Sequence, residues 1–254
     1  TEICDLAHSR GVKLVFDAEQ ASLQKGIDAW TLRYMKRYNK KSAIVFCTYQ
    51  AYLKAAPEVL ASHLAIARKE NFVAGIKLVR GAYINSDPRH LIHDTKADTD
   101  ACYDALAESV MRRSYSDVLM PVQGEESKEF PRVSLALACH NILSVRKAMN
   151  IRKEQTERGE EKIELVYGQL QGMADEVSCE LVQRAQTQKA LPGAGKDIPM
   201  AYKYLVWGTT GECMKYLLRR AQENKDAVAR TKEGRDEMAK EAVRRVKALF
   251  GWSV

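Results

Sequence analysis

Short apolar runs alternate along the chain with longer stretches in which apolar side chains recur every three or four residues. The six apolar runs cover residues 12–17, 43–47, 74–79, 133–138, 163–167 and 202–207. A stretch with helical periodicity follows each run, the first three at residues 18–39, 51–69 and 94–113. Short apolar runs predict buried strands and the longer periodicity predicts amphipathic helices. Repeated strand–helix units predict an α/β fold with parallel strands joined by crossover helices.

Such a fold can close as a (β/α)8 barrel or stay open as a doubly wound sheet. Polar side chains stand at the ends of several of the predicted strands: Asp17, Gln50, Arg80, His140 and Gln169. A barrel assembles its site from the carboxyl ends of several strands, whereas an open sheet concentrates polar residues at one switch point. No G-x-G-x-x-G sequence follows any of the runs. We therefore predict a TIM-like barrel, with about six of its eight βα units in this chain.

The two ends of the sequence lead to further expectations. Because the chain begins at Thr1 and enters an ordered pattern at once, we expect a piece of a longer protein, with any targeting segment upstream. We take residues 1–254 as one catalytic barrel, incomplete at its N-terminus, with residues 225–254 as an amphipathic helical tail. The apolar stripe of that tail is Val243, Val246, Leu249 and Phe250. It can pack against the domain, a membrane surface or a partner.

The composition limits which classes of protein this chain can belong to. With 254 residues and 46% hydrophobic content, the chain can bury one large core or two small ones. No apolar run approaches the roughly 20 residues that cross a bilayer. The net charge of +7 keeps a basic nucleic-acid or membrane-binding module as an alternative, although the basic residues are spread out. Six scattered cysteines without a C-x-x-C pair are typical of free thiols in a reducing compartment.

The segment from residue 216 to residue 224 carries the densest set of candidate binding residues. Read as a helix, it places Tyr216, Arg219, Arg220 and Glu223 at i, i+3, i+4 and i+7, along one stripe. Two adjacent guanidinium groups can bind a planar carboxylate in a bidentate manner. The alternative is a solvated helix face with an i, i+4 ion pair from Arg219 to Glu223.

Three other positions have functional and structural interpretations. Lys77 lies inside a predicted strand, where a buried cation needs a partner. Asp17 ends a strand, either as the N-cap of the next helix or as a site residue. His140 follows another strand and can be a structural histidine. The pair His90 and His93 has no third metal ligand at a useful spacing, so we predict no metal site.

Taken together, these motifs resemble the proline dehydrogenase family, flavin-dependent enzymes of proline catabolism, and are closer to its eukaryotic, fungal-type members. The resemblance covers most of the chain and rests on segments in the family's order: Phe16-Asp-Ala-Glu-Gln20, Thr48-Tyr-Gln-Ala-Tyr-Leu-Lys54, Lys77-Leu-Val-Arg-Gly-Ala-Tyr83, His140-Asn141, Tyr167-Gly-Gln-Leu-Gln-Gly-Met173 and Tyr216–Asn224. The resemblance implies a distorted (β/α)8 barrel that binds FAD. It also implies oxidation of L-proline to 1-pyrroline-5-carboxylate by hydride transfer to flavin N5.

The resemblance also implies a role for each matching residue. The substrate would contact Leu170, Tyr204, Tyr216, Arg219, Arg220 and Glu223, with Asp17 and Lys77 as catalytic residues. The cofactor would contact Gln50, Arg80, Gly81, Ala82, Cys139 and His140. By the same resemblance the protein is mitochondrial and passes electrons to a quinone or another acceptor at the inner membrane. A carboxylate-binding lyase that forms a Schiff base on Lys77 is the alternative within enzymes.

Overall fold

Six parallel strands form the centre of the computed structural model, which describes residues 1–124, 129–190, 197–223, 238–239 and 241–246. The strands are β1 (Leu14–Phe16), β2 (Val45–Gln50), β3 (Ala74–Val79), β4 (Val133–Ala138), β5 (Glu164–Leu170) and β6 (Met200–Tyr204). Their order in the sheet follows the sequence, β1-β2-β3-β4-β5-β6, and every neighbouring pair is parallel. A doubly wound sheet reverses its strand order at a switch point, so the sequential order confirms the TIM-like arrangement.

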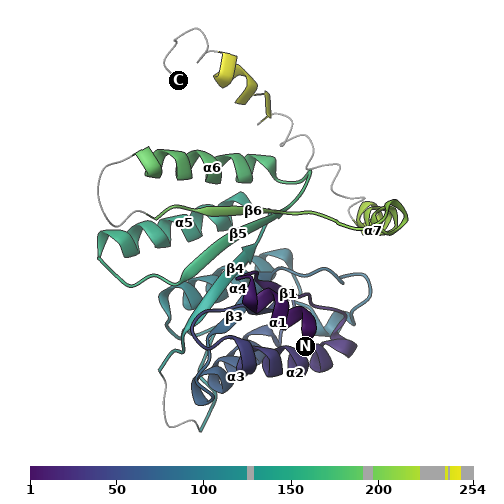
Figure 1. Cartoon of the computed structure of the whole chain (residues 1–254), viewed down its shortest axis with the longest axis vertical. Coiled ribbons are helices and arrows are strands. Elements are labelled where there is room, and N and C mark those ends of the chain that lie inside the picture. The colour runs from purple at the N-terminus through teal and green to yellow at the C-terminus, as the bar shows by residue number, and fades with distance from the viewer. Residues whose placement is uncertain (125–128, 191–196, 224–237, 240, 247–254) are drawn as a thin grey trace.

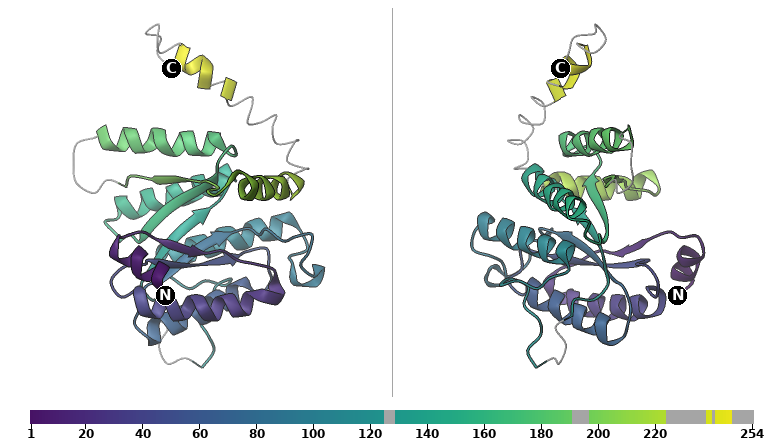
Figure 2. Two further views of the ribbon diagram at one scale, coloured as in Figure 1. Left: turned by 45° about the vertical axis from the view of Figure 1, so that its right-hand side comes forward. Right: turned by 90° about the vertical axis from the view of Figure 1, so that its left-hand side faces the viewer.

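Most of the helices follow a strand and pack on one face of the sheet, whereas the first helix precedes β1 (Figure 1). They are α1 (Glu2–Ser9), α2 (Ala21–Tyr38), α3 (Ala56–Lys69), η1 (Arg89–Leu91), α4 (Lys96–Arg112), α5 (Ile142–Glu157), α6 (Asp175–Ala190) and α7 (Thr210–Glu223). The sheet curls as it passes from β1 to β6, and Figure 2 shows α2–α5 on its outer side. Helix α7 follows β6 at the carboxyl ends of the strands (Figure 1).

Several element boundaries differ from the prediction. Strands β2 and β5 extend past their apolar runs to Gln50 and Leu170, because the ladder continues through polar residues near the strand ends. The sixth strand was predicted too late: β6 ends at Tyr204, and the side chain of Trp207 is 97% exposed. Most of the predicted tail, residues 225–254, lies outside the described residues, although Val243 and Val246 stand in a described helical stretch.

The main core lies between the outer face of the sheet and the helices. Leu78 and Leu135 from the strands are buried there, against Leu60 and Leu64 of α3 and Leu106 of α4. Alternation along each strand sends the intervening side chains to the inner, concave face. That face carries a small apolar cluster of buried Ala43, Phe46 and Val73, with Ala136 packed against it.

Charged and amide groups hold the amino-terminal end of the curl. Lys13, just before β1, forms an ion pair with Glu164 at the start of β5, and its ammonium lies 5.6 Å from the centroid of the Phe46 ring. The fully buried amide of Asn39 donates to the carbonyl groups of Val45 and Val73, at 2.8 and 2.9 Å. The same amide accepts from the backbone N–H groups of Ile44 and Val45. Asn39 thus fixes the starts of β2 and β3 relative to each other.

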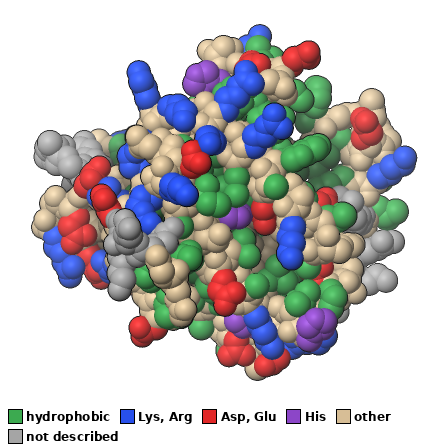
Figure 3. Space-filling model, turned by 90° about the horizontal axis from the view of Figure 1, so that it is seen from below, with side chains coloured by type: hydrophobic (Ala, Val, Ile, Leu, Met, Phe, Trp, Pro, Cys, Tyr) green, Lys and Arg blue, Asp and Glu red, His purple; other side chains and the backbone are tan. Residues whose placement is uncertain are grey.

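The charges of the chain are dispersed on the face that Figure 3 shows. Lys and Arg side chains are interspersed there with acidic and apolar ones. None of the helices among the described residues is both long and apolar enough to cross a membrane.

Candidate functional site

The inner face of the sheet near the strand ends is open and lined by small residues. Ala136 and Ala138 of β4 and Gly168 of β5 are only half-buried, and Ala138 is paired with Gly168 in the ladder. A Cβ built on Gly168 would meet no atom closer than 3.9 Å. The small residues at these positions leave room on the concave face over β4 and the adjoining part of β5.

Lys77 and Asp17, both predicted as site residues, form an ion pair with each other. Lys77 points inward from β3, and its ammonium donates to a carboxylate oxygen of Asp17, which follows β1. The Lys77 side chain is 20% exposed and the Asp17 side chain is 56% exposed. Helix α2 has Gln20 as its N-cap, so Asp17 does not serve as that N-cap. The partner that a lysine inside a strand requires is therefore Asp17.

Gln50, at the end of β2, connects two loops of the site. Its side-chain oxygen accepts the backbone N–H of Ala82 at 3.0 Å, and its nitrogen donates to the carbonyl of Glu19 at 3.2 Å. Gln50 is 3% exposed. Predicted as a cofactor residue, it holds the backbone around Ala82 in place at the carboxyl end of β3.

Arg80 points to the outer side of the sheet, away from Lys77. Its guanidinium donates to Asp100 at 2.5 Å, to the Cys139 sulfur at 3.1 Å and to the Ser144 hydroxyl at 2.8 Å. The same group lies 4.3 Å from the centroid of the Tyr103 ring. The side chain therefore ties β3 to α4 and α5. Gly81, the next residue, packs so closely on a tyrosine that an added Cβ would lie 2.3 Å from Tyr52 Cδ1.

His140 and Leu170 lie side by side, at the ends of β4 and β5. The backbone N–H of Leu170 donates to Nε2 of His140 at 3.0 Å. When the imidazole is neutral, this bond places its proton on Nδ1. The structure thus brings together a predicted cofactor residue and a predicted substrate residue.

The predicted substrate residues of β6 and α7 form a second cluster. The rings of Tyr204 and Tyr216 are 6.2 Å apart between centroids, and Arg220 Nε donates to the Tyr216 hydroxyl at 3.2 Å. Burial, followed by the nearby Tyr216 and Asp17, raises the pKa of Tyr204. The side chains of Arg219 and Glu223 lie outside the described part of α7.

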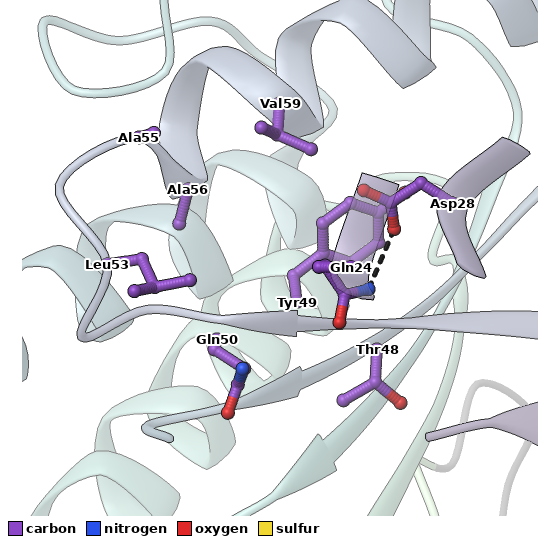
Figure 4. A pocket seen from close by; sticks show the side chains of 9 residues that line it. All are labelled: Gln24, Asp28, Thr48, Tyr49, Gln50, Leu53, Ala55, Ala56 and Val59. Carbon is purple, nitrogen blue, oxygen red and sulfur yellow. Dashed lines mark hydrogen bonds between the residues drawn. The ribbon is translucent and has the colours of Figure 1, made fainter. Parts of the chain in front are cut away.

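A separate hollow lies between α2, β2 and α3, and Figure 4 shows its lining side chains. Its volume is about 60 Å³, which has room for only a few water molecules. In that lining the amide of Gln24 donates to Asp28 at 2.8 Å. This hollow is therefore too small for a cofactor or an amino acid substrate.

Sequence reasoning missed several residues that shape the site. Tyr52 and Asp87 are buried and hydrogen-bonded to each other, and the Tyr83 hydroxyl donates to Glu19 at 2.8 Å. These contacts join residues far apart in sequence, so no local spacing could have revealed them. The described residues, which include His90 and His93, contain no group of three or more His, Cys, Asp or Glu side chains placed to bind a metal ion.

The fold and the position of these residues define a TIM-like α/β barrel protein with its candidate site at the carboxyl ends of the strands. Residues 1–233 match the sequence profile of the family described as proline dehydrogenase. The chain belongs to the proline dehydrogenase family.

Individual relatives agree with this assignment. The chain is 35% identical to the probable mitochondrial proline dehydrogenase of Schizosaccharomyces pombe, over 92% of this chain and 46% of that protein. It is 31% identical to human mitochondrial proline dehydrogenase 1, over 95% of this chain and 37% of that protein. The chain thus spans less than half the length of these two relatives.

A solved structure of similar fold is proline utilization A from Bdellovibrio bacteriovorus. The TM-score is 0.66 at 21% sequence identity, over 88% of this chain and 21% of that one. At this identity the likeness concerns the fold, which is that of a TIM-like barrel.

Proposed function

We propose that the protein containing this chain oxidises L-proline to 1-pyrroline-5-carboxylate with FAD as its cofactor. Membership of the proline dehydrogenase family supports the reaction. The observation that carries the proposal is the pair of clusters at the strand ends: Tyr204, Tyr216 and Arg220 on one side, and Lys77 with Asp17 on the other. The first can bind an amino acid carboxylate, and the second offers a cation beside the open, concave face of the sheet.

The inner face fits a flavin ring. Ala136, Ala138 and Gly168 leave the surface over β4 and β5 free of bulk, and Lys77 stands on the adjacent strand β3. When bound, FAD would supply the electron acceptor for oxidation of the carbon next to the proline nitrogen. The residues proposed to hold it are Lys77, Gln50 and His140, with the backbone of Gly81 and Ala82. Arg80 and Cys139, which contact each other on the outer side of the sheet, would take part by supporting the loop after β3.

The residues of β6 and α7 would hold the substrate. Arg220, together with Arg219 of the same helix, would bind the proline carboxylate, and Glu223 would orient the arginines. Tyr204, Tyr216 and Leu170 would enclose the ring. Because the carboxylate would be held at one point, the carbon to be oxidised would be held at a defined place over the inner face. The Lys77 ammonium would stabilise negative charge that develops there, and Asp17 would keep that ammonium in position.

The cellular setting is part of the same proposal. Relatives from fission yeast and human are named mitochondrial, and we propose the same compartment for this protein. A quinone or another acceptor at the inner membrane would take the electrons, and the protein would contact that membrane peripherally. On the face that Figure 3 shows, basic side chains stand among acidic and apolar ones, and this face gives no support to the alternative of a nucleic-acid-binding module.

Absorbance of the full-length protein tests the proposed function. The purified protein should be yellow, and anaerobic L-proline should bleach its flavin band, whereas D-proline serves as the control. The Schiff-base alternative predicts a colourless protein in which borohydride traps substrate on Lys77. A colourless protein that does not consume proline would contradict the proposal.

A further inference from the structure

Two loops of the candidate site are joined through one buried carboxylate. Asp87, in the loop between β3 and α4, is 7% exposed. One of its oxygens accepts the Tyr52 hydroxyl at 2.5 Å, and the other accepts the backbone N–H of Ala21 at 2.8 Å. Both bonds use the charged form of the carboxylate as acceptor, which makes them stronger than bonds between neutral groups.

The bond to Ala21 fixes the start of α2. The first backbone N–H groups of a helix have no partner within the helix, and a side-chain oxygen at the N-cap usually accepts one of them. The N-cap of α2 is Gln20, which makes no side-chain cap bond. Asp87 supplies the missing acceptor from another loop, and places its negative charge at the positive end of the helix.

Tyr52, the other partner of Asp87, is itself immobilised. Its backbone N–H donates to the carbonyl of Arg80 at 2.7 Å, and its carbonyl accepts the N–H of His93 at 2.9 Å. Its ring occupies the space where a Gly81 side chain would stand. The Asp87 carboxylate is therefore hydrogen-bonded to a tyrosine that is fixed in place, and the ring of that tyrosine packs against Gly81.

The segment that Asp87 holds leads directly to the Lys77–Asp17 pair. Asp17 lies in the short turn between β1 and α2, four residues before Ala21. Glu19 in the same turn accepts the Gln50 amide through its carbonyl and the Tyr83 hydroxyl through its carboxylate. If α2 loses its attachment to Asp87, the turn can shift, and Asp17 moves relative to Lys77.

We propose that Asp87 and Tyr52 are positioning residues of the candidate site. They hold the turn between β1 and α2 so that Asp17 keeps the Lys77 ammonium directed at the inner face. This inference rests on the proposed proline oxidation for its kinetic consequence. The proposed carboxylate-binding residues stand on β6 and α7, which these contacts do not include, so the two residues are expected to influence kcat more than KM.

Kinetics of two variants of the full-length protein test the inference. Asp87→Asn keeps the shape and removes the charge, and Tyr52→Phe removes only the hydroxyl. Each should lower kcat for L-proline roughly tenfold, the scale of one charge-assisted hydrogen bond, while KM changes by less than about twofold. Asp94→Asn is the matched control, because Asp94 lies in the same loop but pairs with Lys54 through a side chain that is 79% exposed. The control should behave as the wild type.

Hydrogen exchange provides a readout that does not depend on the reaction. In the flavin-free protein, Asp87→Asn should speed amide exchange in residues 18–22 and 82–87 and leave α5 and α6 unchanged. Unchanged exchange together with unchanged kcat would overturn the proposal. Loss of stability in which kcat and KM change together in both variants would also overturn it, in favour of a structural role. If the wild type shows local protection but does not oxidise proline, the proposed function fails while the positioning contact stands.

Discussion

Lys77 shows how one charged side chain can stand inside a parallel strand. Its neighbours in the ladder, Thr48 and Ala136, leave space on the inner face, and Asp17 supplies the opposite charge. The Lys77 side chain is 20% exposed, and its ion pair with Asp17 offsets part of the cost of removing the ammonium from water.

Arg220 is the arginine of α7 whose side-chain contacts the structure describes. Arg220→Ala should lower kcat/KM for L-proline at least tenfold in the full-length protein, because a hydrogen bond to a charged group contributes ~1.5–3 kcal/mol. Arg219→Ala should have a similar effect if both guanidinium groups bind the carboxylate. Steady-state kinetics measure the loss, and the flavin content should remain that of the wild type. Lys215→Ala, an exposed position on the same helix, is the control. Unchanged kinetics for Arg220→Ala would contradict the role of α7.

Loss of the Asn39 side chain should destabilise the curved sheet at the amino-terminal ends of β2 and β3. Asn39→Ala removes the hydrogen-bond partner of four buried backbone groups, the N–H of residue 44, the N–H and carbonyl of residue 45, and the carbonyl of residue 73. Since each unsatisfied buried group costs ~1–3 kcal/mol, the free energy of unfolding should fall by at least about 3 kcal/mol. Urea denaturation measures this change. Asn150→Ala, at an exposed position of α5, should have little effect.

At the scale of elements, α7 depends on a cap at its own N-terminus. The Glu212 carboxylate accepts the backbone N–H of Thr209 at 2.9 Å and its hydroxyl at 2.8 Å. Met214, Leu217 and Leu218 of this helix are all more than half exposed, so packing against the rest of the described chain contributes little to it. Because this helix has few tertiary contacts, the cap contributes a large part of the stability of its first turn.

Acid should therefore loosen α7 before the rest of the fold. Hydrogen bonds from Thr209 lower the pKa of Glu212 below its ordinary value of 4.5. The stabilisation from the ionised carboxylate is thus complete above pH 4.5 and is lost as the pH falls through the lowered pKa. Amide exchange in the first turn of α7 should rise in that window, relative to α5. Glu212→Gln should show the faster exchange at neutral pH as well, and no difference between wild type and variant would contradict the role of the cap.

At the scale of the whole molecule, the sheet is a curved open wall. Strands β1 and β6 stand at its two edges, and each pairs with one neighbour among the described strands. Tyr202 and Tyr204 of β6 are 58% and 46% exposed, as expected for side chains that face an interior without an opposite wall. A (β/α)8 barrel has eight strands, so we propose that two further strands close this wall between β6 and β1.

The isolated chain of 254 residues should bind flavin poorly. Without closure the inner face is open to water and two strand edges are unpaired, which favours association between molecules. The chain alone should retain little FAD after gel filtration and should not oxidise L-proline. The full-length protein should retain FAD and oxidise L-proline. Supplying the rest of the protein as a separate chain should restore part of the flavin binding. A yellow, monomeric and active 254-residue chain would show that closure is not required.

The sequence alone determined the order and parallel direction of the strands and most of the helices. Apolar runs and helical periods report local burial, and six strand–helix units in succession leave little freedom of topology. The same local pattern placed Asp17 at the end of a strand and Lys77 inside a strand. The predicted ends of the strands were less accurate, because backbone pairing does not stop where the apolar run stops. Strands β2 and β5 continue into polar residues, and β6 ends before the apolar residue Leu205.

Only the tertiary structure decided which of these residues meet. The curl of the sheet brings Asp17 to Lys77 and Lys13 to Glu164, and the loop after β3 brings Asp87 to the start of α2. The outward direction of Arg80 is explained by its partners on α4 and α5, which no spacing along the chain reveals. Side-chain partners of this kind depend on how elements far apart in sequence pack, whereas hydrophobic periodicity records only the environment of each element separately.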